Sequence, residues 1–159
     1  MNITVICLGK LKEDYLKKAV AEYTKRLCAY GKPEITELTP VKLPENPSDV
    51  QISNALEKEA VEIIKKIPSN SFTVALCVEG VKKSSEQLAE IIKKASVAGK
   101  SNFTFIIGSS YGLSDTVKNM CDLRLSFSDM TFPHQLMRVM LLEQIYRSFQ
   151  INNNGKYHK

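Results

Sequence analysis

The chain has 159 residues, of which 43% are hydrophobic and 25% charged, a composition typical of a globular protein that buries its own core. No apolar run approaches the roughly 20 residues of a membrane-spanning helix, and Met1–Ile6 lacks the positively charged start of a signal peptide. We therefore expect a cytoplasmic protein without a membrane partner. Lysine and arginine (22) outnumber aspartate and glutamate (17), and the resulting basic surface suits a polyanion such as RNA.

Short apolar runs alternate with amphipathic helices in the first half of the chain. A continuous apolar run that ends at Gly9 is typical of a strand buried on both faces. Ser48 and Gln51 form a capping-box pattern, which opens a helix. The predicted elements are, in chain order, strand 3–8, helix 12–30, strand 35–41, loop 43–47 and a helix from Ser48 to about residue 67.

The second half continues the same alternation. Ser84 and Gln87 repeat the capping signature, and Pro133 is suited to the first turn of a long last helix. The predicted elements are strand 72–78, helix 84–99, strand 103–107, helix 114–120, strand 122–127 and helix 135–149. The whole chain, 1–159, is therefore predicted to be a single-domain α/β sandwich on a mostly parallel sheet.

The four cysteines, Cys7, Cys28, Cys77 and Cys121, lie far apart in the sequence. They form no CxxC pair and no cluster with the spacing of zinc ligands, so we expect neither a metal site nor a disulfide. Cys7 and Cys77 lie inside apolar runs, where buried and inert thiols are expected.

Three loops follow the carboxyl ends of predicted strands, where parallel sheets bind ligands. The segment Gly108-Ser109-Ser110-Tyr111-Gly112 places two glycines at a strand-to-helix turn, where the backbone can approach a ligand. An isolated pattern of this kind is more often a tight turn without a ligand. It is neither GxGxxG nor a P-loop, and the turn Leu8–Leu11 lacks the dinucleotide fingerprint, so nucleoside triphosphate, nicotinamide and flavin chemistry are disfavoured.

The loop before Pro133 carries apolar side chains, although loops usually prefer polar ones. Met130 and Phe132 are predicted to cover the core, a flat ligand or a partner chain, and His134 to brace the start of the helix. The helix 135–149 is apolar on nearly every side, which predicts burial against the sheet and a second surface, most simply a dimer partner. Arg138 lies within this apolar arc and requires an anion. A structural carboxylate, a phosphate and the anionic form of a reacting base all remain open.

Four segments together resemble one family of enzymes. They are Ile107–Leu113, the Thr-Phe-Pro-His-x-x-x-Arg block from Thr131 to Arg138, Glu143–Arg147 and the terminal Tyr157-His158-Lys159. In combination they resemble the RlmH (YbeA-like) family of SPOUT-class methyltransferases, and the resemblance covers nearly the whole chain. One departure is Ser109, which stands where the family loop usually has a second glycine.

The resemblance implies a trefoil knot over about 72–159 and a homodimer that uses S-adenosylmethionine and no metal. It implies methylation of nitrogen N3 of a pseudouridine in 23S ribosomal RNA of the large subunit, on the assembled ribosome, with no DNA partner. Carried over by position, the cofactor-binding residues are Leu76, Gly108, Phe127, Ser128, Asp129, Met130, Thr131 and Phe132.

Methylation of a ring nitrogen requires loss of its proton, and a positive group stabilises the developing anion. Arg138, Tyr157 and His158 are the candidate catalytic residues, to orient the base and to help move the proton. In a dimer, the tail of one chain is predicted to reach the cofactor loop of the other. The alternative is a non-catalytic RNA- or ribosome-binding factor, which would bind RNA but not S-adenosylmethionine.

Overall fold

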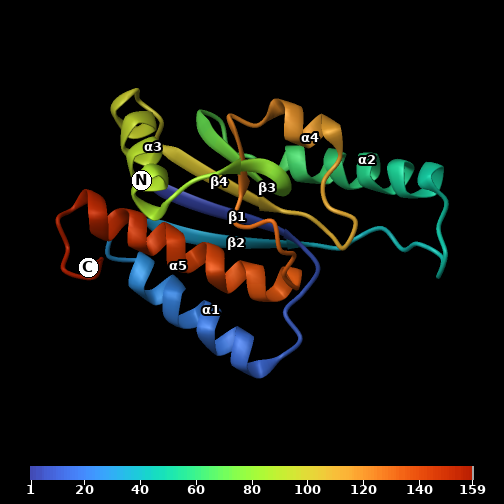
Figure 1. The fold of residues 1–159 in the computed structure, drawn as a ribbon, viewed down its shortest axis with the longest axis horizontal. Coiled ribbons are helices and arrows are strands. Elements are labelled where there is room, and N and C mark those ends of the chain that lie inside the picture. Colours follow the sequence, from blue (N-terminus) through green and yellow to red (C-terminus); the bar gives the residue numbers. More distant parts are fainter. Residues whose placement is uncertain (159) are drawn as a thin grey trace.

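The computed structural model describes residues 1–158, so Lys159 of the predicted tail lies outside the described residues. Strands and helices alternate along the chain (Figure 1). Their bounds are β1 Asn2–Leu8, α1 Asp14–Leu27, β2 Lys32–Leu38, α2 Asp49–Lys65, β3 Ser71–Lys82, α3 Ser85–Val97, β4 Asn102–Ile107, α4 Asp115–Met120, β5 Leu123–Ser126 and α5 His134–Asn152.

The five strands form one sheet in the order β2-β1-β4-β3-β5, and every pair of neighbours is parallel. Parallel strands that are covered on both faces need continuous apolar runs. Strand β4 lies in the middle of the sheet, and its residues 103–107 are all buried. The predicted α/β fold on a mostly parallel sheet is confirmed.

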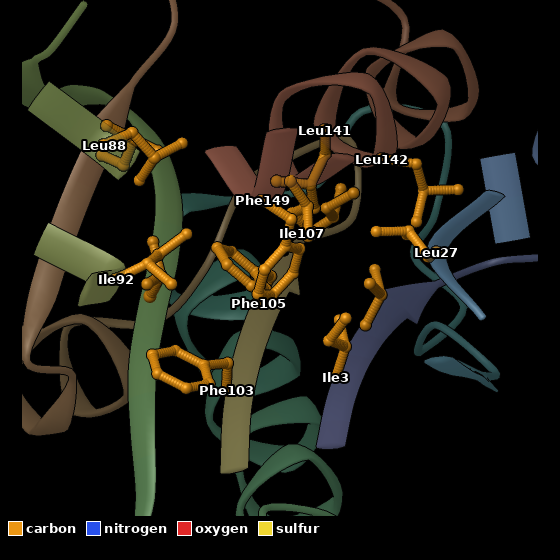
Figure 2. Close-up of a cluster of buried hydrophobic side chains, with 14 of the residues drawn as sticks. Ile3, Leu27, Leu88, Ile92, Phe103, Phe105, Ile107, Leu141, Leu142 and Phe149 are labelled. Atoms are coloured by element: carbon orange, nitrogen blue, oxygen red, sulfur yellow. The ribbon is translucent and has the colours of Figure 1, made fainter. Parts of the chain in front are cut away.

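The helices cover the sheet on both faces (Figure 1). Helices α1, α3 and α5 pack on one face through a large cluster, in which Leu27, Leu88, Ile92, Leu141 and Phe149 meet side chains of β1 and β4 (Figure 2). Helices α2 and α4 cover the other face, where Ala60, Ile63 and Val117 pack on Ile6 and Ile106. No helix within residues 1–158 is long and apolar enough to span a bilayer.

The capping-box patterns in the sequence correctly predicted where α2 and α3 begin. Ser48 and Ser84 each accept a hydrogen bond from the backbone N–H three residues on, and Gln51 and Gln87 complete both predicted capping boxes. The last helix ends at Asn152 rather than near Phe149, and α1 is shorter than the predicted helix 12–30.

The bounds of two predicted strands differ from those in the structure, because the bounds depend on pairing partners. Strand β2 covers Lys32–Leu38 instead of 35–41, since it pairs residue by residue with β1 from Asn2 to Leu8. Strand β3 does not end at Val78. After an irregularity it pairs with β5 again, through Val81 and Lys82. Cys7 is buried as expected, but Cys77 is only half-buried beside this irregularity.

Candidate functional site at the carboxyl end of the sheet

Strand β4 ends between two crevices. It leads to α4 on one face of the sheet, whereas its neighbours β1 and β3 lead to α1 and α3 on the opposite face. The chain therefore diverges on both sides of the end of β4. Such points, outside the carboxyl ends of the strands, are where parallel α/β sheets bind ligands.

The larger crevice, between β4 and β3, is a cavity of about 780 Å³. This volume lies within the range of roughly 300–1,000 Å³ found for small-molecule sites. Seven of the eight predicted cofactor residues line it: Leu76, Gly108, Phe127, Ser128, Met130, Thr131 and Phe132. Asp129 is absent from the lining, and its carboxylate pairs with Lys82 instead. The structure thus brings these seven residues together, while binding of a cofactor there stays a prediction.

The loop 108–112 is held by its own backbone. The N–H of Gly112, which has a φ of +86°, donates to the carbonyl of Ser109 at 2.8 Å. A Cβ at Gly108 would overlap the carbonyl group of Gly112. Glycine is therefore required at position 108 by the fold of the loop, so a Gly108→Val variant tests loop folding before it tests ligand binding. Ser109 does not have a positive φ, so serine replaces the family's usual glycine without backbone strain.

The segment after β5 is held more lightly. The hydroxyl of Ser126 donates to the carbonyl of Ser128, and the N–H of Met130 donates to the Ser128 hydroxyl at 3.0 Å. Met130 and Phe132 line the cavity while they remain 74% and 37% exposed. Met130 and Phe132 were predicted to cover the core, a flat ligand or a partner chain. The first of these roles is wrong, and the other two stay predictions.

One wall of the larger cavity is charged. The ammonium of Lys118 donates to the carboxylate of Glu79 at 2.5 Å. This hydrogen bond lowers the pKa of Glu79 below its usual value and raises the pKa of Lys118, so both groups stay ionised at neutral pH. The sequence carries no sign of this pair, because the two residues lie in separate elements and meet only through the fold.

The smaller crevice, between β4 and β1, is a cavity of about 230 Å³. Its wall combines Gly9 at the end of β1, the segment 40–43, the helix α2 and the loop 109–111. His134 and the loop 109–111 border both cavities, so the two adjoin. Glu59 lines the smaller cavity and is 5% exposed. The sequence did carry a signal for it, since a carboxylate lies on the apolar face of a predicted helix.

Arg138 lies beneath the cavities and lines neither of them. It is 1% exposed, and its guanidinium donates to the carboxylate of Glu37 at 2.5 Å and to the carbonyl of Gly9 at 3.0 Å. The sequence left open a structural carboxylate, a phosphate or an anionic base as the partner of Arg138. In the structure this partner is a carboxylate, that of Glu37. This contact fixes the start of α5 to β1 and β2. Burial raises the pKa of the neighbouring Cys7 thiol to about 11, so this thiol stays protonated.

The tail lies on its own helix, away from the cavities. The hydroxyl of Tyr157 donates to Glu143 at 2.9 Å, and the guanidinium of Arg147 lies 4.7 Å from the centre of the Tyr157 ring. The ring of His158 contacts Glu86 at 2.6 Å and Arg147 at 3.2 Å. Glu143 lies six residues beyond Met137 in the cavity wall, about 9 Å along α5, and Figure 1 shows the chain end beside the far half of that helix. One chain alone therefore does not bring Tyr157 and His158 to the cavity.

Comparison with known proteins defines the class first. A family model described as a predicted SPOUT methyltransferase matches residues 1–158, and the chain belongs to this family.

Individual relatives match over the full length of both chains. Proteins named ribosomal RNA large subunit methyltransferase H from Bacillus cytotoxicus and Bacillus thuringiensis subsp. konkukian are 52% and 50% identical over 159 residues. A Methanococcus maripaludis protein that carries this name provisionally is 54% identical, again over all of both chains.

A solved structure supports the fold independently. A probable methylase family protein from Haemophilus influenzae Rd KW20 superposes with a TM-score of 0.52 and 13% identity, covering 99% of this chain and 70% of that one. At this identity the likeness concerns the fold alone. The trefoil knot stays a prediction.

Proposed function

We propose that the protein transfers the methyl group of S-adenosylmethionine to N3 of a pseudouridine in 23S ribosomal RNA, acting in the cytoplasm as a homodimer on the assembled ribosome. One observation carries the proposal. The cavity of about 780 Å³ lies at a strand-end crevice, and its wall is built from the same loops that carry the motifs of the resemblance. Relatives named for methylation of large-subunit ribosomal RNA, matched over their full length, supply the substrate class.

The lining of the larger cavity fits S-adenosylmethionine. Leu76, Leu125 and Met130 offer apolar surface for a flat purine, and the strand ends offer backbone donors and acceptors for its edge. Lys118 and Glu79 carry opposite charges for the carboxylate and ammonium groups of the amino-acid part. When bound, the cofactor supplies an electrophilic methyl group on a sulfonium centre.

The residues of the chain then have to position the base and remove a proton. A neutral imide nitrogen is a poor nucleophile, so N3 must lose its proton as the new bond to carbon forms. Tyr157 and His158 carry the polar groups suited to this step, and we assign them to the site of a second copy, since their own chain holds them away from the cavity. Arg138 acts as a positioning residue that holds the start of α5.

A homodimer is supported by the exposed apolar residues around the first turns of α5. Leu136, Phe132 and Met130 are 38%, 37% and 74% exposed and lie close together in the sequence. Sedimentation at micromolar concentration should give about twice 17.9 kDa. Met140→Lys, on the same helix, should shift the protein toward the monomer, and a wild-type monomer would contradict the proposed assembly.

Two measurements test the reaction. Titration calorimetry should show binding of S-adenosylmethionine, and radiolabelled methyl groups should be transferred to 70S ribosomes from a strain that lacks this modification. Ribosomes with uridine at the target position are the matched control, and they should accept no label. A protein that binds ribosomes but not S-adenosylmethionine would instead be the non-catalytic RNA-binding factor.

A further inference from the structure

The smaller cavity has the position of a ligand site but no role in holding the methyl donor. It occupies the crevice between β1 and β4, where the chain leaves toward opposite faces of the sheet. At about 230 Å³ it is less than a third of the larger cavity, so it suits a single ring rather than a whole nucleotide. The loop 109–111 and His134 form a wall common to both cavities.

The buried carboxylate of Glu59 is the distinctive group in this cavity. One oxygen accepts from the backbone N–H of Val41 at 3.0 Å, and the other accepts from the hydroxyl of Ser109 at 3.2 Å. A carboxylate has about four acceptor sites, so about two remain for a ligand. These contacts also join the segment 40–43 to the loop that separates the cavities.

Glu59 has no cationic partner within residues 1–158, because no lysine, arginine or histidine nitrogen there lies within 4.0 Å of its carboxylate. A charge that is buried in a protein normally has a partner. A negative wall repels phosphates and carboxylates. It favours a ligand that donates a hydrogen bond, either a cation or a neutral ring with an N–H group, and the volume of the cavity suits a single ring.

Among pyrimidine nucleosides, pseudouridine offers one N–H more than uridine. Its ribose is attached through carbon C5, so N1 keeps a hydrogen that uridine lacks. We propose that the smaller cavity holds the target base, flipped out of its stack, and that Glu59 accepts a hydrogen bond from N1–H. N3 lies on a different edge of the ring and is then free to face the wall shared with the larger cavity.

The surroundings of the cavity suit an RNA strand. Lys10 follows Gly9 and Lys42 follows Val41, and both lysines are exposed at the end of the sheet where the cavity opens. Neither forms an ion pair within the described part of the chain. They are available to phosphates on either side of a flipped base. In the proposed site, Lys10 and Lys42 at the rim contact the RNA phosphates, and Glu59 inside the cavity accepts a hydrogen bond from the base.

Nucleoside binding tests the site directly. Saturation-transfer NMR with pseudouridine, uridine and 1-methylpseudouridine should show pseudouridine bound about tenfold more tightly than the other two, because a hydrogen bond to a charged group has that worth. Glu59→Gln should reduce the preference, because a neutral amide oxygen accepts a weaker hydrogen bond than a carboxylate does. Glu57→Gln is the matched control, since it removes an exposed carboxylate from the same helix, outside this cavity, and should retain the preference.

A second variant guards against misfolding of the first. Leu43→Trp fills the cavity from a loop and should weaken binding of all three nucleosides, while calorimetry with S-adenosylmethionine gives the wild-type Kd within about twofold for every variant. Equal binding of the three nucleosides by the wild-type protein would overturn the proposal. So would wild-type nucleoside binding by both Glu59→Gln and Leu43→Trp.

The inference rests on the proposed function, but the two fail differently. If the wild-type protein methylates ribosomes and both cavity variants do so at the same kcat/KM, the base site is wrong and the function stands. If the wild-type protein methylates nothing yet selects pseudouridine through Glu59, the function is wrong and the site stands.

Discussion

The two ends of α5 differ in chemistry. At the amino end, apolar side chains such as Phe132 and Leu136 are partly exposed around an open cavity, and the buried Arg138 fixes the backbone below it. At the carboxyl end, polar and aromatic groups are already satisfied by one another, with Glu143 and Arg147 holding the tail.

This contrast separates binding from proton chemistry. The amino end offers a largely apolar pocket, but Tyr157 and His158 of the same chain do not line it. The carboxyl end holds Tyr157 and His158, through Glu143 and Glu86, and neither residue lines that pocket. A single chain thus contains the proposed binding pocket without the proposed proton-handling groups, and a second copy is the simplest way to combine the two ends.

The largest expected effect comes from removing the tail. Deletion of residues 156–159 should leave folding and S-adenosylmethionine affinity nearly unchanged, because the tail touches neither cavity. Methyl transfer to ribosomes should fall by a hundredfold or more, since correct positioning can supply several kcal/mol of the barrier, on the order of 7 at best. Single-turnover transfer measures the loss. If the truncated protein transferred methyl groups at the wild-type rate, the tail would have no part in the reaction.

Mixing two defective chains shows whether the ends combine across the dimer. Chains that lack the tail are combined with chains that carry Phe132→Ala at the cavity. If the tail serves the partner's cavity, mixed dimers regain one intact site. If the tail served its own cavity, neither site of a mixed dimer would be intact, and no activity would return.

Next in size is the loss of Arg138. Arg138→Ala leaves Glu37 without its partner and removes a buried side chain, so the free energy of unfolding should fall by about 3 kcal/mol. This is the lower end of the usual range, because a third of the Glu37 side chain (32%) is exposed. Urea unfolding measures the change, and adding Glu37→Gln should recover part of it. Full stability with lost transfer would assign Arg138 to catalysis instead.

A smaller effect is expected from Met130, at the lightly held side of the cavity. Met130→Ala removes a side chain that is 74% exposed, so stability should change by less than about 0.5 kcal/mol. Affinity for S-adenosylmethionine should fall about tenfold, because apolar area over the ligand is lost. Met120→Ala is the matched control, since this methionine is 44% exposed and lines no part of the cavity. Equal affinities of the two variants would leave Met130 as a partner contact only.

The sequence predicted those parts of the molecule that local chemistry determines. Continuous apolar runs gave the buried parallel strands, and Ser48 and Ser84 gave two helix starts. Seven of the eight predicted cofactor residues, which were carried over from the family resemblance, line one cavity, and they meet there because loops after parallel strands lie at one edge of the sheet. The return of β3 to pair with β5 was missed, since Glu79-Gly80 has the composition of a turn and only β5 makes the segment a strand.

Groups whose partners lie far away in sequence were not predictable. Arg138 is paired with a residue 101 positions earlier, and His158 with one 72 positions earlier. Glu59 stands out in the sequence as a carboxylate on an apolar helix face. The groups that it contacts, the N–H of Val41 and the hydroxyl of Ser109, are known only from the structure. Periodicity can show that such a group is buried, and only the fold can show what it faces.

The smallest expected effect concerns the tail contact at the carboxyl end of α5. The pKa of Glu86 is lowered to about 2, first by a hydrogen bond from Ser84, then by a backbone N–H, and only third by His158. Because the folded pKa lies below the usual value, any stabilisation is present at higher pH and is lost as the pH falls from about 4.5 toward 2. A ¹³C NMR titration of the Glu86 carboxyl should give a midpoint near this low value. His158→Ala should raise the midpoint while leaving it below 4.5, because the two larger causes lie at the start of α3 and remain. A midpoint that does not move in His158→Ala would mean that the tail does not dock on Glu86 in solution. The carboxyl end of α5 would then not hold the tail as described above.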